Sequence, residues 1–204
     1  MRKLSLFIAT SLDGYIAKPN DDLSFLKSVE KEGEDYGYAA FMDTIDTIIL
    51  GRKTYDFVVR EIGASHYDNG ERKVYVITRT ARPDTGNTTF YTGDPAGLVH
   101  RLKAEDGKNI FCDGGAEIIH ELLKHDLIDE FIISIVPVLV GNGTRLFKDG
   151  RPEQKLELVK VEAFDTGLVQ MRYVKEVRPT KAFGGVMRVV KTLKSRTRKR
   201  TGAG

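Results

Sequence analysis

The first 140 residues alternate short apolar runs with segments whose apolar residues recur at helical spacing, and apolar runs then follow one another. Residues 3–10 are apolar on both faces, which predicts a central strand. This order of elements predicts an α/β fold with a mostly parallel central sheet and an antiparallel C-terminal edge. Further strands are predicted at residues 47–50, 74–78, 88–91, 109–112, 131–140, 156–163 and 169–175.

Capping residues mark the predicted helices between these strands. Asp94 followed by Pro95 predicts a helix through Ala104, because proline favours the first helical position. Asp21 or Asp22 would cap a short helix that continues to residue 31. Other helices are predicted at residues 36–43 and 54–59, and a last one opens at Gly114-Gly115 and carries Ile118, Ile119, Leu122 and Leu123 at helical spacing.

Charge divides the chain into two unequal parts. The 204 residues carry 32 basic and 29 acidic side chains, but residues 177–204 hold nine basic and no acidic ones. The rest is therefore net acidic, which argues against a nucleic-acid-binding core, since phosphate binding needs a basic face. We predict a folded domain over residues 1–176 and a basic, disordered tail over residues 177–204. The alternative is that the tail is an arm that binds nucleic acid or an acidic partner.

The remaining composition excludes several classes of protein. One cysteine allows no intrachain disulfide, so a cytoplasmic location is expected, and Cys112 is expected to be a buried small hydrophobe. No apolar run reaches the roughly 18 residues that would span a bilayer, so no membrane partner is expected. The four histidines show no metal-ligand spacing, and no metal site is predicted.

Two predicted strand-to-helix junctions have the composition of anion sites. The first is Gly51-Arg52-Lys53-Thr54, where a buried strand ends and a helix opens with two cations and a hydroxyl. The second is Gly114-Gly115-Ala116, whose glycines let the backbone approach a ligand closely. Helix N-termini favour phosphate because they present free N–H groups and a positive dipole end. Each junction alone also fits an ordinary helix start or turn, but two in one sheet favour a ligand with several phosphates, such as a dinucleotide.

A third segment places a cation beside hydroxyl groups at a strand end. Thr78 and Arg79 follow the predicted strand at residues 74–78. An arginine in this position would bind the 2′-phosphate that distinguishes NADP from NAD. A solvated loop arginine is the alternative.

Five motifs in order and spacing connect these pieces to a known family. They are Ser11-Leu12-Asp13-Gly14-Tyr15-Ile16-Ala17, Leu50-Gly51-Arg52-Lys53-Thr54-Tyr55-Asp56, Val76-Ile77-Thr78-Arg79, Asp113-Gly114-Gly115-Ala116, and Val136-Pro137-Val138-Leu139-Val140-Gly141-Asn142-Gly143 with Leu146-Phe147. Together they resemble the dihydrofolate reductase superfamily, in particular stand-alone proteins related to the reductase domain of the riboflavin-biosynthesis deaminase-reductase. The resemblance covers about residues 1–176 and implies a dihydrofolate-reductase-like domain with helices on both faces of the sheet.

The resemblance implies an NADPH-dependent reductase that transfers hydride to a small heterocyclic substrate, either a pterin or a ribosylaminopyrimidine-like compound. The activity of 5-amino-6-(5-phosphoribosylamino)uracil reductase is the nearest example. By position, Gly51, Arg52, Lys53 and Thr54 would hold the cofactor phosphates, Thr78 and Arg79 the 2′-phosphate, Gly114, Gly115 and Ala116 the pyrophosphate and nicotinamide, and Ala9 and Ile16 would line the nicotinamide site. Many relatives pair through their C-terminal strands, so the resemblance also implies a homodimer.

Three residues are candidates on the substrate side. Asp22 would be a buried carboxylate that orients a ring and helps deliver a proton, or it would cap a helix. Arg72 precedes a strand, as does the arginine that grips the folate tail in dihydrofolate reductases, and is otherwise a surface charge. Tyr15 stands where the riboflavin branch usually carries lysine, and would face the substrate or pack against the first helix. The alternatives to this function are a non-catalytic NADPH- or nucleotide-binding module and dihydrofolate reductase proper.

Overall fold

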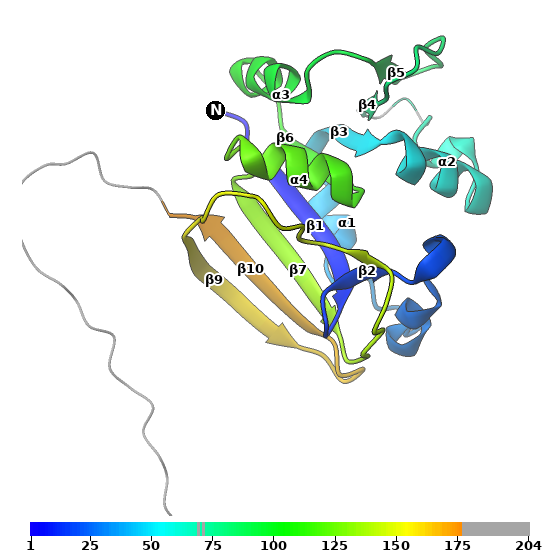
Figure 1. Ribbon diagram of the computed structural model, residues 1–204, viewed down its shortest axis with the longest axis vertical. Helices are drawn as coiled ribbons and strands as arrows, with labels where there is room; N and C mark the ends of the chain where they lie inside the picture. The colour runs from blue at the N-terminus through cyan, green and yellow to red at the C-terminus, as the bar shows by residue number, and fades with distance from the viewer. Residues whose placement is uncertain (69, 71, 177–204) are drawn as a thin grey trace, which may run out of the picture.

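The computed structural model describes residues 1–176 apart from residues 69 and 71. Its main sheet has eight strands in the order β5-β4-β3-β6-β1-β7-β10-β9 (Figure 1). All neighbouring strands from β5 to β7 are parallel, whereas β10 runs antiparallel to both β7 and β9. The predicted α/β fold, with its antiparallel C-terminal edge, is therefore confirmed. The predicted tail at residues 177–204 lies outside the described residues, and its boundary at residue 176 stays a prediction.

The element bounds follow the predicted ones to within a few residues in most places. The strands of the main sheet are β1 (Leu4–Ser11), β3 (Ile45–Gly51), β4 (Lys73–Ile77), β5 (Thr88–Tyr91), β6 (Asn109–Gly114), β7 (Glu130–Val136), β9 (Leu156–Ala163) and β10 (Val169–Lys175). The α-helices are α1 (Tyr38–Met42), α2 (Arg52–Glu61), α3 (Pro95–Ala104) and α4 (Ala116–Lys124). Three short 3₁₀ helices are η1 (Pro19–Asp21), η2 (Ser24–Val29) and η3 (Ala64–His66).

Helices cover both faces of the sheet, as the alternation of side chains along each strand requires. Leu6 of β1 packs in one buried cluster with residues of α3 and α4. Its neighbour Phe7 points to the opposite face, where its ring lies 5.0 Å from that of Phe41 in α1. Figure 1 shows α4 in front of the sheet and α1 behind it. Two apolar layers therefore hold the sheet, and the carboxyl ends of its parallel strands lie at one edge.

Helix α3 begins at its predicted cap. The Asp94 side chain accepts hydrogen bonds from the backbone N–H groups of Ala96 and Gly97, at 3.1 and 2.8 Å, and Pro95 follows as the first helical residue.

We expect Asp94→Ala to lower the free energy of unfolding by about 1 kcal/mol, because two backbone donors lose their acceptor. Urea unfolding would measure this loss. The control is Asp106→Ala, because Asp106 is exposed. We expect its free energy of unfolding to stay within about 0.5 kcal/mol of wild type.

The structure differs from the prediction in two places that border the site. The chain on either side of Asp22 forms the 3₁₀ turns η1 and η2, not the predicted helix capped by Asp21 or Asp22. Strand β7 ends at Val136 and not at residue 140, because Pro137 has no N–H group for the sheet. The chain beyond it returns to form a second, two-stranded sheet of β2 (Tyr15–Ala17) and β8 (Thr144–Arg145). Sequence analysis did not predict this small sheet.

Candidate active site

The two predicted anion junctions lie side by side at the carboxyl edge of the sheet. β3 and β6 are neighbours, and their register places Leu50 opposite Gly114. Helix α2 starts directly after Gly51, and helix α4 starts directly after Gly115. The Thr54 hydroxyl accepts a hydrogen bond of 3.0 Å from the Gly115 N–H group. The first turn of α2 is thereby joined to the glycine turn that precedes α4.

The N-termini of these two helices differ from that of α3. Asp94 caps α3, whereas Gly51 and Gly115 stand at the N-cap positions of α2 and α4 and provide no side-chain cap. The first N–H groups of a helix have no partner within the helix itself. The structure therefore leaves two adjacent helix starts, on neighbouring strands, with backbone donors that suit the oxygens of a phosphate.

Side chains in place of the glycines at these junctions would strain the backbone or crowd neighbouring atoms. Gly114 has φ +111°, a backbone conformation that favours glycine. A Cβ atom on Gly115 would lie 3.0 Å from the Thr54 hydroxyl, and one on Gly51 would lie 3.2 Å from Cγ1 of Ile118. This combination of glycine backbone and uncapped helix starts fits a pyrophosphate-containing cofactor.

Basic side chains surround the two helix starts. Arg52 and Arg82 both pair with Asp56, the latter at 3.0 Å, so one carboxylate holds two guanidinium groups beside α2. On α4, Glu117 pairs with Lys148; this contact lowers the pKa of Glu117, and the charge of Arg79 adds to the effect. Cations therefore outnumber carboxylates among the groups described here, which favours an anionic ligand.

The third predicted segment lies at the end of β4, two strands from β6. The Thr78 side chain is buried, and its hydroxyl accepts a hydrogen bond of 3.1 Å from the backbone N–H of Thr80. Arg79 is exposed, and its charge reaches Glu117 at the start of α4. The structure thus brings the Thr78 segment to the same edge as the two glycine junctions.

A cavity of about 610 Å³ opens on the α1 face of the sheet, along strand β1. Phe7 and Ala9 of β1, Ser134 of β7 and apolar residues of η2 line it. Ala9 follows Ile8, whose Cδ1 would lie 3.7 Å from a Cβ on Gly114. Strand β1 therefore borders the cavity through Phe7 and Ala9 on one face and contacts the second glycine junction through Ile8 on the other. Four carboxylates and one lysine surround the cavity: Glu30, Glu32, Glu34, Asp35 and Lys31.

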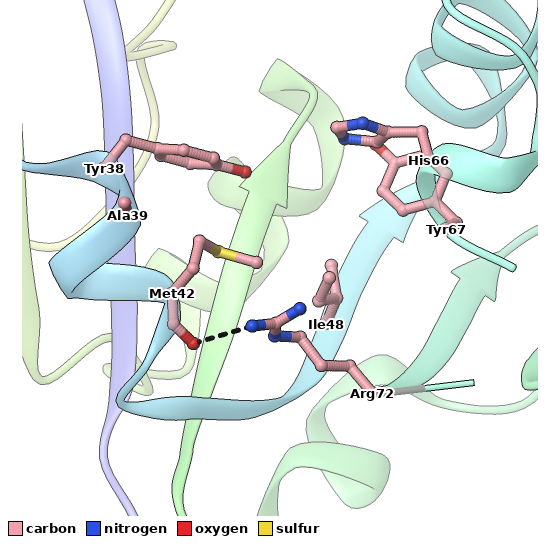
Figure 2. Close-up of a pocket in the computed structure, with 7 residues that line it drawn as sticks. All are labelled: Tyr38, Ala39, Met42, Ile48, His66, Tyr67 and Arg72. Atoms are coloured by element: carbon pink, nitrogen blue, oxygen red, sulfur yellow. Dashed lines mark hydrogen bonds between the residues drawn. The ribbon is translucent and has the colours of Figure 1, made fainter. Parts of the chain in front are cut away.

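A second cavity, of about 320 Å³, lies between α1, η3 and the start of β4. Figure 2 shows Tyr38 and Met42 on one side of it, His66 and Tyr67 on the other, and Arg72 below. The Arg72 guanidinium donates a hydrogen bond of 3.2 Å to the Met42 carbonyl. Tyr38 lines both cavities, so they meet at this side chain. Of the predicted substrate residues Asp22, Tyr15 and Arg72, only Arg72 lines one of these two cavities.

The expected burial of Asp22 is wrong. Its side chain is 49% exposed and accepts hydrogen bonds from the backbone N–H and the hydroxyl of Ser24, at 2.7 and 3.1 Å. These hydrogen bonds lower the pKa of Asp22. Because the chain here forms a 3₁₀ turn, its carboxylate stabilises the local backbone and lines neither cavity.

Tyr15, the second predicted substrate residue, lines neither cavity and is held by contacts with the segment around Gly141 and Arg145. It is buried, its ring lies 4.7 Å below the Arg145 guanidinium, and its hydroxyl donates to the Gly141 carbonyl at 3.3 Å. Asp13 ties the same loop to the opposite segment by accepting hydrogen bonds from the N–H groups of Val140 and Gly141. The hydroxyl of Ser11 and these backbone donors lower the pKa of Asp13 to about 2. Half-buried Ile16 packs against the core cluster on the α4 side of the sheet, to which Ile8 and Ile118 also belong.

Comparison with known proteins agrees with this geometry. Residues 2–170 match the family model of the RibD C-terminal domain. The chain belongs to this family. Two proteins of Bacillus subtilis (strain 168) are similar to it along nearly their whole length: the uncharacterized protein YwjB is 40% identical and covers 85% of this chain and 98% of its own, and the uncharacterized protein YyaP is 32% identical and covers 84% and 94%.

Two solved structures share the fold. A protein of Shewanella sp. PV-4 described as a "Putative riboflavin biosynthesis protein" superposes with a TM-score of 0.77 at 30% identity, over 86% of this chain and 99% of its own. A pyrimidine reductase-like protein of Corynebacterium diphtheriae superposes with a TM-score of 0.61 at 14% identity, over 87% and 92%, which shows the fold alone. This member of the RibD C-terminal domain family thus has a reductase-like fold.

Sequence analysis missed several residues that line the site. Tyr38, Tyr67 and Ser134 border the two cavities, but none stands in a motif that the sequence singles out. Asp113 stands in a recognised motif as the residue before two glycines, and its own contact with Tyr67 could not be predicted. These two residues are 46 positions apart, so no local spacing connects them.

Proposed function

We propose that this protein is an NADPH-dependent reductase that transfers hydride to a small heterocyclic substrate, either a pterin or a ribosylaminopyrimidine-like compound. The observation that carries the proposal is the pair of uncapped helix starts, joined by Thr54 and Gly115, together with a cavity on β1, the strand that contacts the second junction through Ile8. The family membership and the reductase-like fold support it. When bound, the cofactor supplies the hydride.

In this proposal the chain's own residues bind and orient. Gly51, Arg52, Lys53 and Thr54 at α2, with Gly114, Gly115 and Ala116 at α4, hold the phosphates through backbone donors and positive charge. Thr78 and Arg79 bind the 2′-phosphate. Ala9 and Ile16 border the nicotinamide. The substrate spans the two cavities past Tyr38, with its reacting bond between the end of β1 at Ala9 and the Tyr67 hydroxyl, and Arg72 contacts the part of it in the smaller cavity.

The charge around the larger cavity bears on the substrate. Its carboxylates repel the anionic tail of a folate, since the one lysine there, Lys31, is paired with Asp165 at 3.0 Å. This favours a neutral heterocycle over the substrate of dihydrofolate reductase proper.

The placements of Asp22 and Tyr15 outside both cavities favour the second candidate, a module that binds NADPH without turnover. Oxidation of NADPH with a pterin or ribosylaminopyrimidine separates the two.

Arg79 provides the sharpest test of cofactor choice. We expect Arg79→Gln to weaken NADPH binding about tenfold and to leave NADH binding unchanged, because the lost charge-assisted contact of roughly 1.5 kcal/mol involves only the 2′-phosphate. Isothermal titration of both cofactors measures the two affinities. Arg101→Gln is a matched control, because this exposed arginine lies in the last turn of α3 and outside the predicted anion sites. Equal losses for NADPH and NADH would argue against the assigned role of Arg79.

The homodimer remains a proposal, which the outer strand supports. β9 is an edge strand, and Leu158, Val159 and Val161 are each about half exposed there, at 51%, 54% and 53%. Exposed apolar side chains on an edge strand are typical of a strand that pairs with another chain.

No helix in the described part of the chain is long and apolar enough to cross a membrane. The cytoplasmic location stays a prediction from the single cysteine.

A further inference from the structure

Tyr67 and Asp113 form a contact that the binding roles above do not use. Tyr67 follows η3, and Asp113 is the residue before the Gly114-Gly115 turn. The Tyr67 hydroxyl donates a hydrogen bond to Oδ2 of Asp113. The Tyr67 ring stacks on Tyr55 of helix α2, with ring centroids 5.7 Å apart and planes 21° apart. The pair is therefore fixed between α2 and β6, directly beside the proposed cofactor site.

The same pair borders the cleft. Tyr67 is 2% exposed and lines the smaller cavity, where Figure 2 shows it across from the hydroxyl of Tyr38. Tyr38 in turn lines the larger cavity with Phe7 and Ala9. Asp113 is half-buried and, two residues after Phe111 on β6, points to the same face of the sheet. A ligand that occupies the larger cavity and passes Tyr38 would meet the Tyr67 hydroxyl.

The environment of Asp113 is unusual for a carboxyl group. Burial raises its pKa to about 6, even though the hydrogen bond from Tyr67 favours the carboxylate and lowers it. Burial also raises the pKa of Tyr38 to about 12, with a contribution from the charge of Asp113. Carboxyl groups with a pKa near neutrality in a cleft are typical of proton donors.

Resting on the proposed reductase function, we propose that Tyr67 and Asp113 form the proton-donating pair of this cleft. Tyr67 gives its hydroxyl proton to the nitrogen or oxygen of the C=N or C=O bond whose carbon receives hydride from the reduced nicotinamide. The step uses the protonated form of Asp113, in which the hydrogen bond is reversed and the Asp113 O–H donates to the Tyr67 oxygen. This O–H bond breaks at the same time, and its proton restores the Tyr67 hydroxyl. The substrate gains one hydride and one proton, and the Asp113 carboxylate regains its proton from water. Tyr67 is the catalytic residue, and Asp113 positions and resupplies it.

Other titratable groups face the pair and must be separated from it. His66 packs on the Tyr67 ring with centroids 4.8 Å apart, so an imidazole lies next to the pair. Tyr38 of α1, Tyr55 of α2 and Arg72 before β4 complete the surroundings. The variant His66→Asn removes the neighbouring imidazole, and Tyr55→Phe removes a hydroxyl from the same aromatic stack.

The test combines a titration with a single-turnover rate. Carbon-13 NMR of the full chain, labelled at the aspartate side-chain carbonyl, measures the Asp113 midpoint, assigned with Asp113→Asn. We expect a midpoint near 6 that moves in Tyr67→Phe and stays in Tyr55→Phe and His66→Asn. Oxidation of bound NADPH by 7,8-dihydropterin is expected to slow about 100-fold in Tyr67→Phe and Asp113→Asn at pH 7, with NADPH affinity within twofold of wild type. The decline in rate above pH 6 should persist in His66→Asn and disappear in Asp113→Asn.

Two results would overturn the pair. An Asp113 midpoint near the ordinary value of about 4 removes its proton supply at neutral pH, whatever the rates are. Wild-type rates in Tyr67→Phe would show that another group donates the proton. Failure of NADPH to bind wild type is a separate result, because it contradicts the proposed function while the NMR titration still measures the pair on its own.

Discussion

Replacing Gly143 with alanine is expected to lower the free energy of unfolding by about 3 kcal/mol, combining the strain of a positive φ with an overpacked contact. Gly143 has φ +138°, and a Cβ atom there would lie 2.0 Å from the carbonyl oxygen of Ala17 and 2.9 Å from Cα of Lys18. Both neighbouring atoms belong to the backbone, so the chain must move to make room. This movement would separate β2 from β8, which are paired through Ala17 and Thr144.

Gly141 is the matched control for this prediction. It has φ +77°, but a Cβ atom added there would meet no other part of the described chain within 4 Å, so Gly141→Ala tests backbone strain alone. We expect that variant to lose about 1 kcal/mol. Urea unfolding of both variants measures the difference, and near-equal losses would show that the close approach of Gly143 to the β2 backbone is not a tight contact.

Replacing Asp113 with asparagine is expected to change how stability depends on pH. The pKa of Asp113 is raised by burial from 3.8 to about 6, so the folded protein keeps a proton that the unfolded chain loses first. The wild-type free energy of unfolding therefore falls as pH rises from about 4 to above 6, and the shift corresponds to about 2–3 kcal/mol. Asp113→Asn has no such proton to lose, and its amide oxygen still accepts the hydrogen bond from Tyr67.

Urea unfolding at several pH values measures this second prediction. The stability of Asp113→Asn relative to wild type should rise between pH 4 and pH 7 and then stay level. Asp22→Asn serves as the control, because hydrogen bonds lower the pKa of that exposed carboxyl and its stability contribution changes with pH in the opposite sense. Parallel pH profiles for Asp113→Asn and wild type would contradict a raised pKa at Asp113.

The fold and the anion junctions could be predicted from the sequence because they depend on local patterns. Buried strands that end at Gly51 and at Gly114 are each visible in a short window, and the carboxyl ends of parallel strands meet at one edge. The hydrogen bond between Thr54 and Gly115 confirms that these two junctions meet. Their role in binding a cofactor stays a prediction.

The substrate side could not be predicted in the same way. A capping carboxylate and a catalytic carboxylate have the same sequence signal, and Asp22 acts in neither way. Its carboxylate accepts the Ser24 N–H in the turn before η2, whose N-cap residue is Leu23. Tyr67 and Asp113 meet only through the tertiary fold, and Tyr67 lies in a segment with no periodic pattern. The cleft between η2, α1 and β1 depends on how loops pack, which side-chain patterning does not determine.

Thermal unfolding of the full chain with NADPH and, separately, with NADH tests the central claim most directly. A cofactor present at a hundred times its dissociation constant should add about 2.7 kcal/mol to the free energy of unfolding. The account predicts that NADPH raises the unfolding midpoint far more than NADH at equal concentration. No shift with either cofactor would contradict the cofactor site at α2 and α4.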